Sequence, residues 1–233
     1  MNPKPLLLLL LGVISVSFAA IFIRLAEAPA LVIAMYRLVI ASLVILPFTW
    51  KSAAAAFKGI DRRTVIQVIL AGVFLAAHFV LWITSLEYTS IASSVILVTA
   101  HPVFVAAVSY ILWKEKLNRP LISGIIIAMA GIVIISGGGL ALGLDVFIGN
   151  MMALTAGLFA ASYLMIGRVV REKITAAAYL VLVYGTGAAV LLVLTLLTRA
   201  ELTGYSQTTC VMFFLLAIIP QLLGHSSFNL ATR

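Results

Sequence analysis

The sequence predicts an all-α polytopic membrane protein built from inverted five-helix repeats, with about eight transmembrane helices in this chain. Three observations lead to this fold class: the composition, a series of long apolar runs, and a partial internal repeat. The 233 residues are 64% hydrophobic and only 9% charged, whereas soluble domains carry roughly 25% charged residues. A soluble fold of this length has too little interior to cover so much apolar surface, so the lipid bilayer must be its solvent.

Apolar runs of about 20 residues, the length that spans a bilayer, follow one another along the whole chain. The first continues past the small residues at 17–20, which favours a membrane span over a cleavable signal peptide. Short polar connections separate the runs, and the longest of these is expected at 51–63. The predicted spans are 5–24, 30–50, 64–86, 91–113, 120–140, 146–167, 174–198 and 208–230.

Basic residues alternate between the two ends of these spans. The net charge of +8 is not gathered on one face, which argues against nucleic-acid binding. With the N-terminus in the cytoplasm, only Arg24 and Arg199 fall at external ends. The positive-inside rule therefore predicts a multi-pass protein of the inner membrane with a cytoplasmic N-terminus. Twelve basic residues fall at the cytoplasmic ends: Lys4, Lys51, Lys58, Arg62, Arg63, Lys114, Lys116, Arg119, Arg168, Arg171, Lys173 and Arg233.

Short motifs recur in the same order in spans one to three and spans six to eight. Phe18-Ala19-Ala20 returns as Phe159-Ala160-Ala161, and Leu70-Ala71 with His78 returns as Leu216-Ala217 with His225. A repeat unit of five helices is odd, so its second copy enters the membrane from the opposite side, as in many secondary transporters. We therefore expect a first repeat at 1–140 and an incomplete second repeat at 141–233.

The second repeat contains three predicted helices where the first contains five. A complete protein is then expected to carry roughly 60–70 further residues, enough for two more spans. A natural eight-helix protein is the alternative. Small residues at helical spacing also predict faces where helices approach closely, and these are Ala153, Gly157 and Ala161 in the sixth span and Gly124, Ala128 and Gly131 in the fifth.

Arg37 is the strongest functional signal, because it lies well inside the second predicted span. An arginine at the centre of a membrane helix costs about 2.5–3.5 kcal/mol on insertion scales, so it should face the bundle interior or water. It would either bind an anionic or carboxylate group or hold the helix bundle together. Tyr36, beside it, is a further candidate for the transport pathway.

Two helical faces carry the other candidate cavity residues. His78, Trp82 and Ser85 share one face of the third span, and Gln221, His225 and Asn229 share one face of the eighth. The faces occupy equivalent positions in the two repeats, where a central substrate cavity is expected. Bonds between helices alone would be the plainer explanation.

The fourth span contains His101 directly before Pro102, whose missing N–H leaves a backbone carbonyl free. His101 would line the cavity or bond that carbonyl. Glu115, at the end of this span, would be a solvated charge or part of a gate. If a proton is coupled to transport, the histidines are the residues with a suitable unperturbed pKa. The spacing of the three histidines and the single cysteine predicts no metal site, and no cofactor is implied.

Two segments resemble EamA-type transporters of the drug/metabolite transporter (DMT) superfamily. Ala34-Met35-Tyr36-Arg37-Leu38-Val39-Ile40-Ala41 resembles the second-helix signature of that family. The block His101-Pro102-Val103-Phe104-Val105-Ala106-Ala107, followed by Leu112-Trp113-Lys114-Glu115-Lys116-Leu117-Asn118-Arg119-Pro120, Gly124 and Gly131, is the more specific match. The resemblance implies a ten-helix bundle with both termini cytoplasmic, which carries small metabolites, often amino acids or their analogues, usually outward.

Other functions explain the sequence less well. A membrane-embedded enzyme would need a nucleophile with its base or a metal cluster, and the chain has neither H-E-x-x-H nor G-x-S-x-G. A membrane scaffold would not need polar faces at matching repeat positions. Carriers of nucleotide sugars or cationic drugs are the alternatives among transporters, although a cation carrier would favour a carboxylate in mid-span. The expected partners are the lipid bilayer and a small-molecule substrate.

Overall fold

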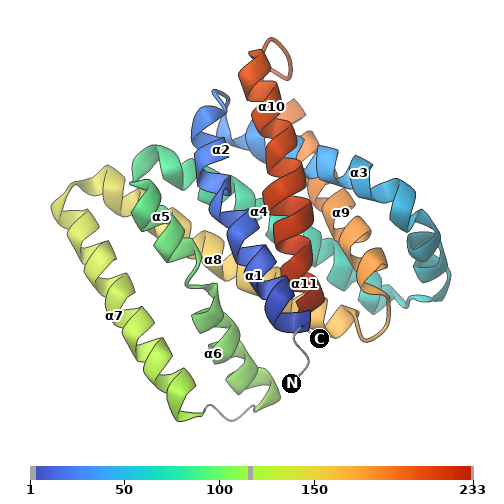
Figure 1. Ribbon diagram of the computed structural model, residues 1–233, viewed down its shortest axis with the longest axis horizontal. Helices are drawn as coiled ribbons and strands as arrows, with labels where there is room; N and C mark the ends of the chain where they lie inside the picture. Colours follow the sequence, from blue (N-terminus) through green and yellow to red (C-terminus); the bar gives the residue numbers. More distant parts are fainter. Residues whose placement is uncertain (1–3, 115–117, 232–233) are drawn as a thin grey trace. The chain divides into compact units, whose positions relative to one another are not determined.

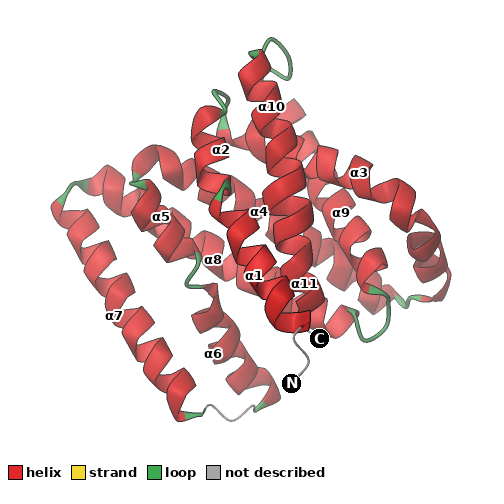
Figure 2. Cartoon of the chain, in the orientation of Figure 1, coloured by secondary structure: helices red, strands yellow, loops and turns green. Residues whose placement is uncertain are grey.

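The computed structural model describes residues 4–114 and 118–231, and within these ranges every regular element is a helix joined by short loops (Figures 1 and 2). The chain divides into two compact units, Met1–Ala76 with Tyr163–Arg233, and Ala77–Ser162. The helices are α1 (Lys4–Ser17), α2 (Ala19–Leu25), α3 (Ala30–Gly59), α4 (Arg62–Tyr88), α5 (Ile91–Val98), α6 (His101–Trp113), α7 (Arg119–Ala141), α8 (Leu144–Val170), α9 (Ala176–Leu197), α10 (Gln207–Leu216), the π-helix η1 (Ala217–His225) and α11 (Ser226–Ala231).

Seven stretches in the described residues are long and apolar enough to cross a membrane, and an eighth apolar helix, Arg119–Ile135, is shorter. All eight predicted spans therefore have a helical counterpart, which confirms an all-α polytopic membrane protein. The seven long stretches are Leu6–Leu25, Ala30–Ala56, Arg62–Tyr88, Ile91–Ile111, Leu144–Val170, Ala176–Leu197 and Gln207–Leu230.

The connection expected at 51–63 is much shorter in the structure. Helix α3 continues to Gly59 and α4 begins at Arg62, so only Ile60 and Asp61 lie between them. The four alanines at 53–56 explain the extension, because alanine has the highest helix propensity. The sequence-based boundary at residue 50 is therefore wrong.

Two predicted spans are reshaped at a proline. The fourth is broken at Thr99 and Ala100, between α5 and α6, just before Pro102. The eighth contains the nine-residue π-helix η1 with Pro220 inside it. At its end the Ser226 N–H donates to the carbonyl of Gln221, five residues back, instead of the four-residue step of an α-helix. A proline cannot donate that four-residue bond, so both places depart from a regular α-helix.

In the first unit, the helices approach closely where glycine replaces a side chain. A Cβ atom built on Gly72 of α4 would lie 2.6 Å from the Cβ of Thr186 in α9. One built on Gly187 would lie 2.7 Å from Cδ1 of Leu38 in α3. Likewise, Gly224 of η1 lies against Val16 of α1, beside which it runs (Figure 1). These contacts allow α3, α4 and α9 to pack backbone against side chain, as small residues do in membrane bundles.

In the second unit, Leu97, Ile132 and Ala153 form a buried cluster from α5, α7 and α8. Gly157 lies against the α5 backbone, since a Cβ there would be 2.9 Å from the Val98 carbonyl oxygen. The predicted close-packing face of the sixth span is therefore confirmed at this glycine. The prediction of a close-packing face on the fifth span is wrong for the described residues, because a Cβ on Gly124 or Gly131 would meet nothing within 4 Å.

Candidate functional site

Arg37 lies at the centre of a buried polar cluster in the first unit. Helix α3 places its side chain at 0% exposure, and Nε donates to Oε1 of Gln221 in η1 at 2.9 Å. Gln221 is itself fully buried, and its amide Nε2 has no hydrogen-bond partner among the described residues. The sequence-predicted Arg37 and Gln221 thus meet across 184 positions of chain.

Two tyrosines, Tyr163 and Tyr184, belong to this cluster, and a third, Tyr179, lies next to it. All three are almost fully buried. Tyr163 of α8 shares a hydrogen bond with Nδ1 of His225, at 2.9 Å, and Tyr184 of α9 shares one with the Ser226 hydroxyl, at 3.2 Å. The hydroxyl of Tyr179 donates to the Tyr163 carbonyl oxygen at 2.8 Å. We call Arg37, Tyr163, Tyr184, Gln221, His225 and Ser226 the Arg37 cluster. It holds a guanidinium, an amide, an imidazole and hydroxyls, a set rich in hydrogen-bond donors.

Asn229, in α11, lies one turn beyond this cluster, and its bonds hold α11 in place. Its amide Nδ2 donates to the His225 carbonyl at 2.9 Å. Arg171, at the end of α8, donates to the Asn229 backbone carbonyl and, through Nε, to that of Gly167 at 3.0 Å. These bonds join α11 to α8, which the sequence did not indicate for Arg171.

Tyr36 contacts a different part of the first unit from its neighbour Arg37. Its hydroxyl donates to the carbonyl of Leu202, in the connection between α9 and α10, at 2.6 Å. Its ring stacks on Phe213, with centroids 4.6 Å apart and planes at 9°. Adjacent helical residues do not share a face, so the structure does not bring Tyr36 into the Arg37 cluster by these contacts.

The predicted face of His78, Trp82 and Ser85 lies in the second unit. His78 Nδ1 contacts the Ala156 carbonyl of α8 at 2.9 Å, and its ring is parallel to that of Trp82, 6.1 Å away. Ser85 bonds Ser94 of α5 at 2.7 Å. Two of the three residues therefore bond a neighbouring helix, while the buried Trp82 indole N–H has no hydrogen-bond partner in the described part of the chain.

His101 and Pro102 mark the break between α5 and α6. The carbonyl that Pro102 cannot bond is that of Val98, four residues back, and His101 Nδ1 contacts this oxygen at 3.3 Å. Of the two sequence-based alternatives, the contact corresponds to the carbonyl-bonding one. Pro102 itself is exposed. Glu115, the proposed gating or structural charge, lies outside the described residues.

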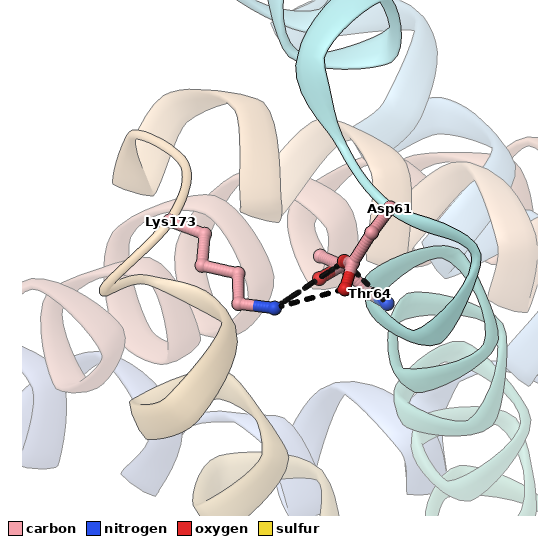
Figure 3. A network of polar contacts seen from close by, with 3 residues as sticks. All are labelled: Asp61, Thr64 and Lys173. Carbon is pink, nitrogen blue, oxygen red and sulfur yellow. Dashed lines mark hydrogen bonds and ion pairs between the residues drawn. The ribbon is translucent and has the colours of Figure 1, made fainter.

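A second polar network, missed by the sequence analysis, lies at the basic end of the first unit (Figure 3). Asp61 caps α4 by accepting from the Thr64 backbone N–H at 3.1 Å and from the Thr64 hydroxyl. Lys173, between α8 and α9, lies 3.3 Å from the Asp61 carboxylate and 3.0 Å from the Thr64 hydroxyl. The bonds from Thr64, followed by the one from Lys173, lower the pKa of Asp61 to about 2. Asp61 three residues before Thr64 is a recognisable capping pattern, but its partner Lys173 is 112 residues away.

Comparisons with known proteins agree with this fold. The model of the EamA-like transporter family matches residues 3–137. An uncharacterized transporter, YxxF of Bacillus subtilis (strain 168), is 31% identical over 110 residues, which cover 46% of this chain. The matched part spans only 35% of that relative's length. A crystal structure of another protein superposes with a TM-score of 0.75 at 14% identity, covering all of this chain and 80% of the other, and so supports the fold alone.

The family match covers more than half of the chain, and it includes Arg37, His78 and the His101–Pro102 break. The other residues of the Arg37 cluster, from Tyr163 to Ser226, lie beyond the matched range. The chain belongs to the EamA-like transporter family of the DMT superfamily.

Proposed function

We propose that the protein is a secondary transporter that exports small metabolites bearing a carboxylate, amino acids or related compounds, by alternating access. The observation that carries the proposal is the burial of Arg37 at 0% exposure against the Gln221 amide. A charged residue inside a membrane span is expensive and is commonly retained for function. A guanidinium is also the side chain best suited to bind a carboxylate through two parallel bonds.

The composition of the Arg37 cluster supports an anionic rather than a cationic substrate. Its six residues carry one permanent positive charge and no carboxylate. In the described part of the chain, the acidic residues lie in connections or within two residues of the ends of the membrane-spanning stretches, as Glu87 and Asp145 do. The carboxylate that would attract a cationic drug in mid-membrane is therefore missing from these residues.

Two further parts of the proposal rest on charge. The concentration of basic residues at one set of helix ends supports a cytoplasmic N-terminus in the inner membrane. His225, which shares a hydrogen bond with Tyr163, is the proposed group for a coupled proton, because histidine is the side-chain type whose unperturbed pKa suits that task. Transport rates that stay flat between about pH 5 and 8 would rule out this coupling.

The direct test is counterflow of a panel of radiolabelled amino acids in proteoliposomes that contain the protein encoded by the natural gene. Arg37→Lys keeps the charge but loses the forked geometry, so we expect at least a tenfold lower exchange rate. Arg199→Lys, the same change in an arginine outside the cluster, is the control and should leave the rate unchanged. Equal rates in all three proteins would refute the role of Arg37. Exchange of nucleotide sugars or cations instead of carboxylated metabolites would assign another substrate class.

A further inference from the structure

A cleft in the first unit lies between the end of α3 and the connection from α8 to α9. It comprises two adjoining cavities of about 450 and 380 Å³. Both are lined by Ala55, Ala56, Lys173 and Ile174. The larger also reaches Lys51, and the smaller also reaches Asp61. This space is separate from the Arg37 cluster, since none of the lining residues belongs to that cluster.

The larger cavity has the chemistry of a phosphate site. Two lysines, Lys51 and Lys173, line it together with Ser52 and Thr175. Thr175 caps α9 by accepting from the Ala178 N–H at 3.2 Å, so its hydroxyl proton is still available to donate. The 22-residue helix α9 begins at Ala176 and directs the positive end of its dipole to the same place.

The position of the cleft along the helices favours a lipid over a dissolved ion as the ligand. Of the two membrane-spanning stretches that border it, one ends at Ala56 and the other begins at Ala176. The cleft therefore lies at the depth of the phospholipid headgroups. Its walls also include the apolar side chains of Ala55 and Ile174, against which the glycerol backbone and the start of an acyl chain can pack.

We propose that this cleft binds the phosphate headgroup of an anionic phospholipid, through Lys51 and Lys173. Basic pockets between membrane helices are a known way of retaining anionic lipids. The inference goes beyond the proposed transport function and does not depend on which substrate the protein carries.

Asp61 allows the proposal to predict in which direction a substitution changes the lipid affinity. In the structure Lys173 lies 3.3 Å from the Asp61 carboxylate (Figure 3), so a lipid phosphate must share this ammonium with a competing negative charge. Asp61→Asn removes that charge while keeping a good capping residue for α4. The lysine substitutions and the aspartate substitution should therefore change lipid affinity in opposite directions.

The experiment is native mass spectrometry of the detergent-solubilised chain, titrated with dioleoyl phosphatidylglycerol and, in parallel, with dioleoyl phosphatidylcholine. We expect phosphatidylglycerol to bind more tightly. Lys51→Gln and Lys173→Gln should each weaken that binding about fivefold, the effect of one basic residue at a membrane surface. Asp61→Asn should strengthen it. Arg119→Gln, which removes an exposed charge in the second unit, is the control and should leave it unchanged.

Several outcomes would overturn the proposal. Equal affinity for the two lipids would show that the phosphate charge is not recognised, and equal losses in Arg119→Gln would show unspecific attraction. Weaker binding in Asp61→Asn would mean that the network acts only by holding the fold. Inorganic phosphate that binds with the same dependence on both lysines would identify a free ion as the ligand. If Lys173→Gln does not fold, Lys51→Gln is decisive, because Lys51 takes no part in the Asp61–Thr64–Lys173 network.

Discussion

The close contact between α4 and α9 predicts that Gly72→Ala destabilises the protein. The new Cβ would lie 2.6 Å from Thr186 Cβ, 2.7 Å from its Cγ2 and 3.1 Å from the Gly187 backbone nitrogen. Carbon atoms in contact normally lie about 3.5–4.0 Å apart, so the helices must separate locally by almost 1 Å. Thr186 cannot rotate away freely, because its hydroxyl donates to the Leu182 carbonyl at 2.8 Å.

The expected magnitude follows from two opposing effects. Overpacking of a buried contact costs about 1–3 kcal/mol, while replacing glycine by alanine within a helix contributes about 1 kcal/mol of stability. The net loss is up to about 2 kcal/mol, which corresponds to at most roughly 4–8 °C in the unfolding temperature for a chain of this size. Gly185→Ala in α9 is the matched control, since its Cβ would meet nothing within 4 Å, and it should leave the temperature unchanged or raise it.

Thermal unfolding of the detergent-solubilised variants, followed by tryptophan fluorescence, measures both changes. A double-mutant cycle then identifies the cause, because Gly72→Ala should be much less harmful in a Thr186→Gly background, where the contacted side chain is absent. Equal unfolding temperatures for Gly72→Ala and Gly185→Ala, or no coupling to residue 186, would refute the packing argument.

Three other predictions follow from local contacts. Tyr36→Phe keeps the stack on Phe213 but removes the bond to Leu202, so it should cost about 0.5–1.5 kcal/mol and speed hydrogen exchange in residues 199–206; unchanged exchange would contradict it. Gly157→Ala brings a Cβ to 2.9 Å from the Val98 carbonyl and should lower the unfolding temperature, whereas Gly124→Ala should not. Because the pKa of Asp61 is lowered from 3.8 to about 2, its carboxylate stabilises the fold fully above pH 3.8 and loses this effect as the pH falls through 2. The advantage of the wild type over Asp61→Asn in thermal unfolding should accordingly shrink between pH 4 and 2, and an advantage that is undiminished at pH 2 would contradict the assignment.

The membrane-spanning helices were predictable because their signal is local. A run of about 20 apolar residues can be recognised as a membrane span from its own residues alone. Each predicted span has a helix in the structure. The boundary at residue 50 failed for a reason that is also local, since the alanine-rich segment after it continues α3. The inverted repeat of 1–140 and 141–233 remains a prediction.

The candidate site was predictable only in part, because its contacts are not local. Arg37 and Gln221 were recognisable separately as polar residues inside spans, but nothing in their spacing indicates that they bond each other. Tyr36 was a pathway candidate because it adds a polar tip to an apolar span, but the sequence did not indicate that its hydroxyl bonds the connection after α9 instead. The glycine face of α7 shows the same limit, since spacing identifies a smooth surface but not whether another helix covers it.

The π-helix η1 has a consequence for how this region can vary in length among relatives. Each of its turns closes on a residue one position further back than in an α-helix, so the segment from Ala217 to His225 contains more residues than an α-helix needs for the same turns. Loss of one residue there would let the segment relax to an α-helix while α11 keeps its orientation. The same deletion inside α9 would turn every later side chain by about 100°. Single-residue insertions and deletions in related sequences should therefore gather at η1 and be absent from α9.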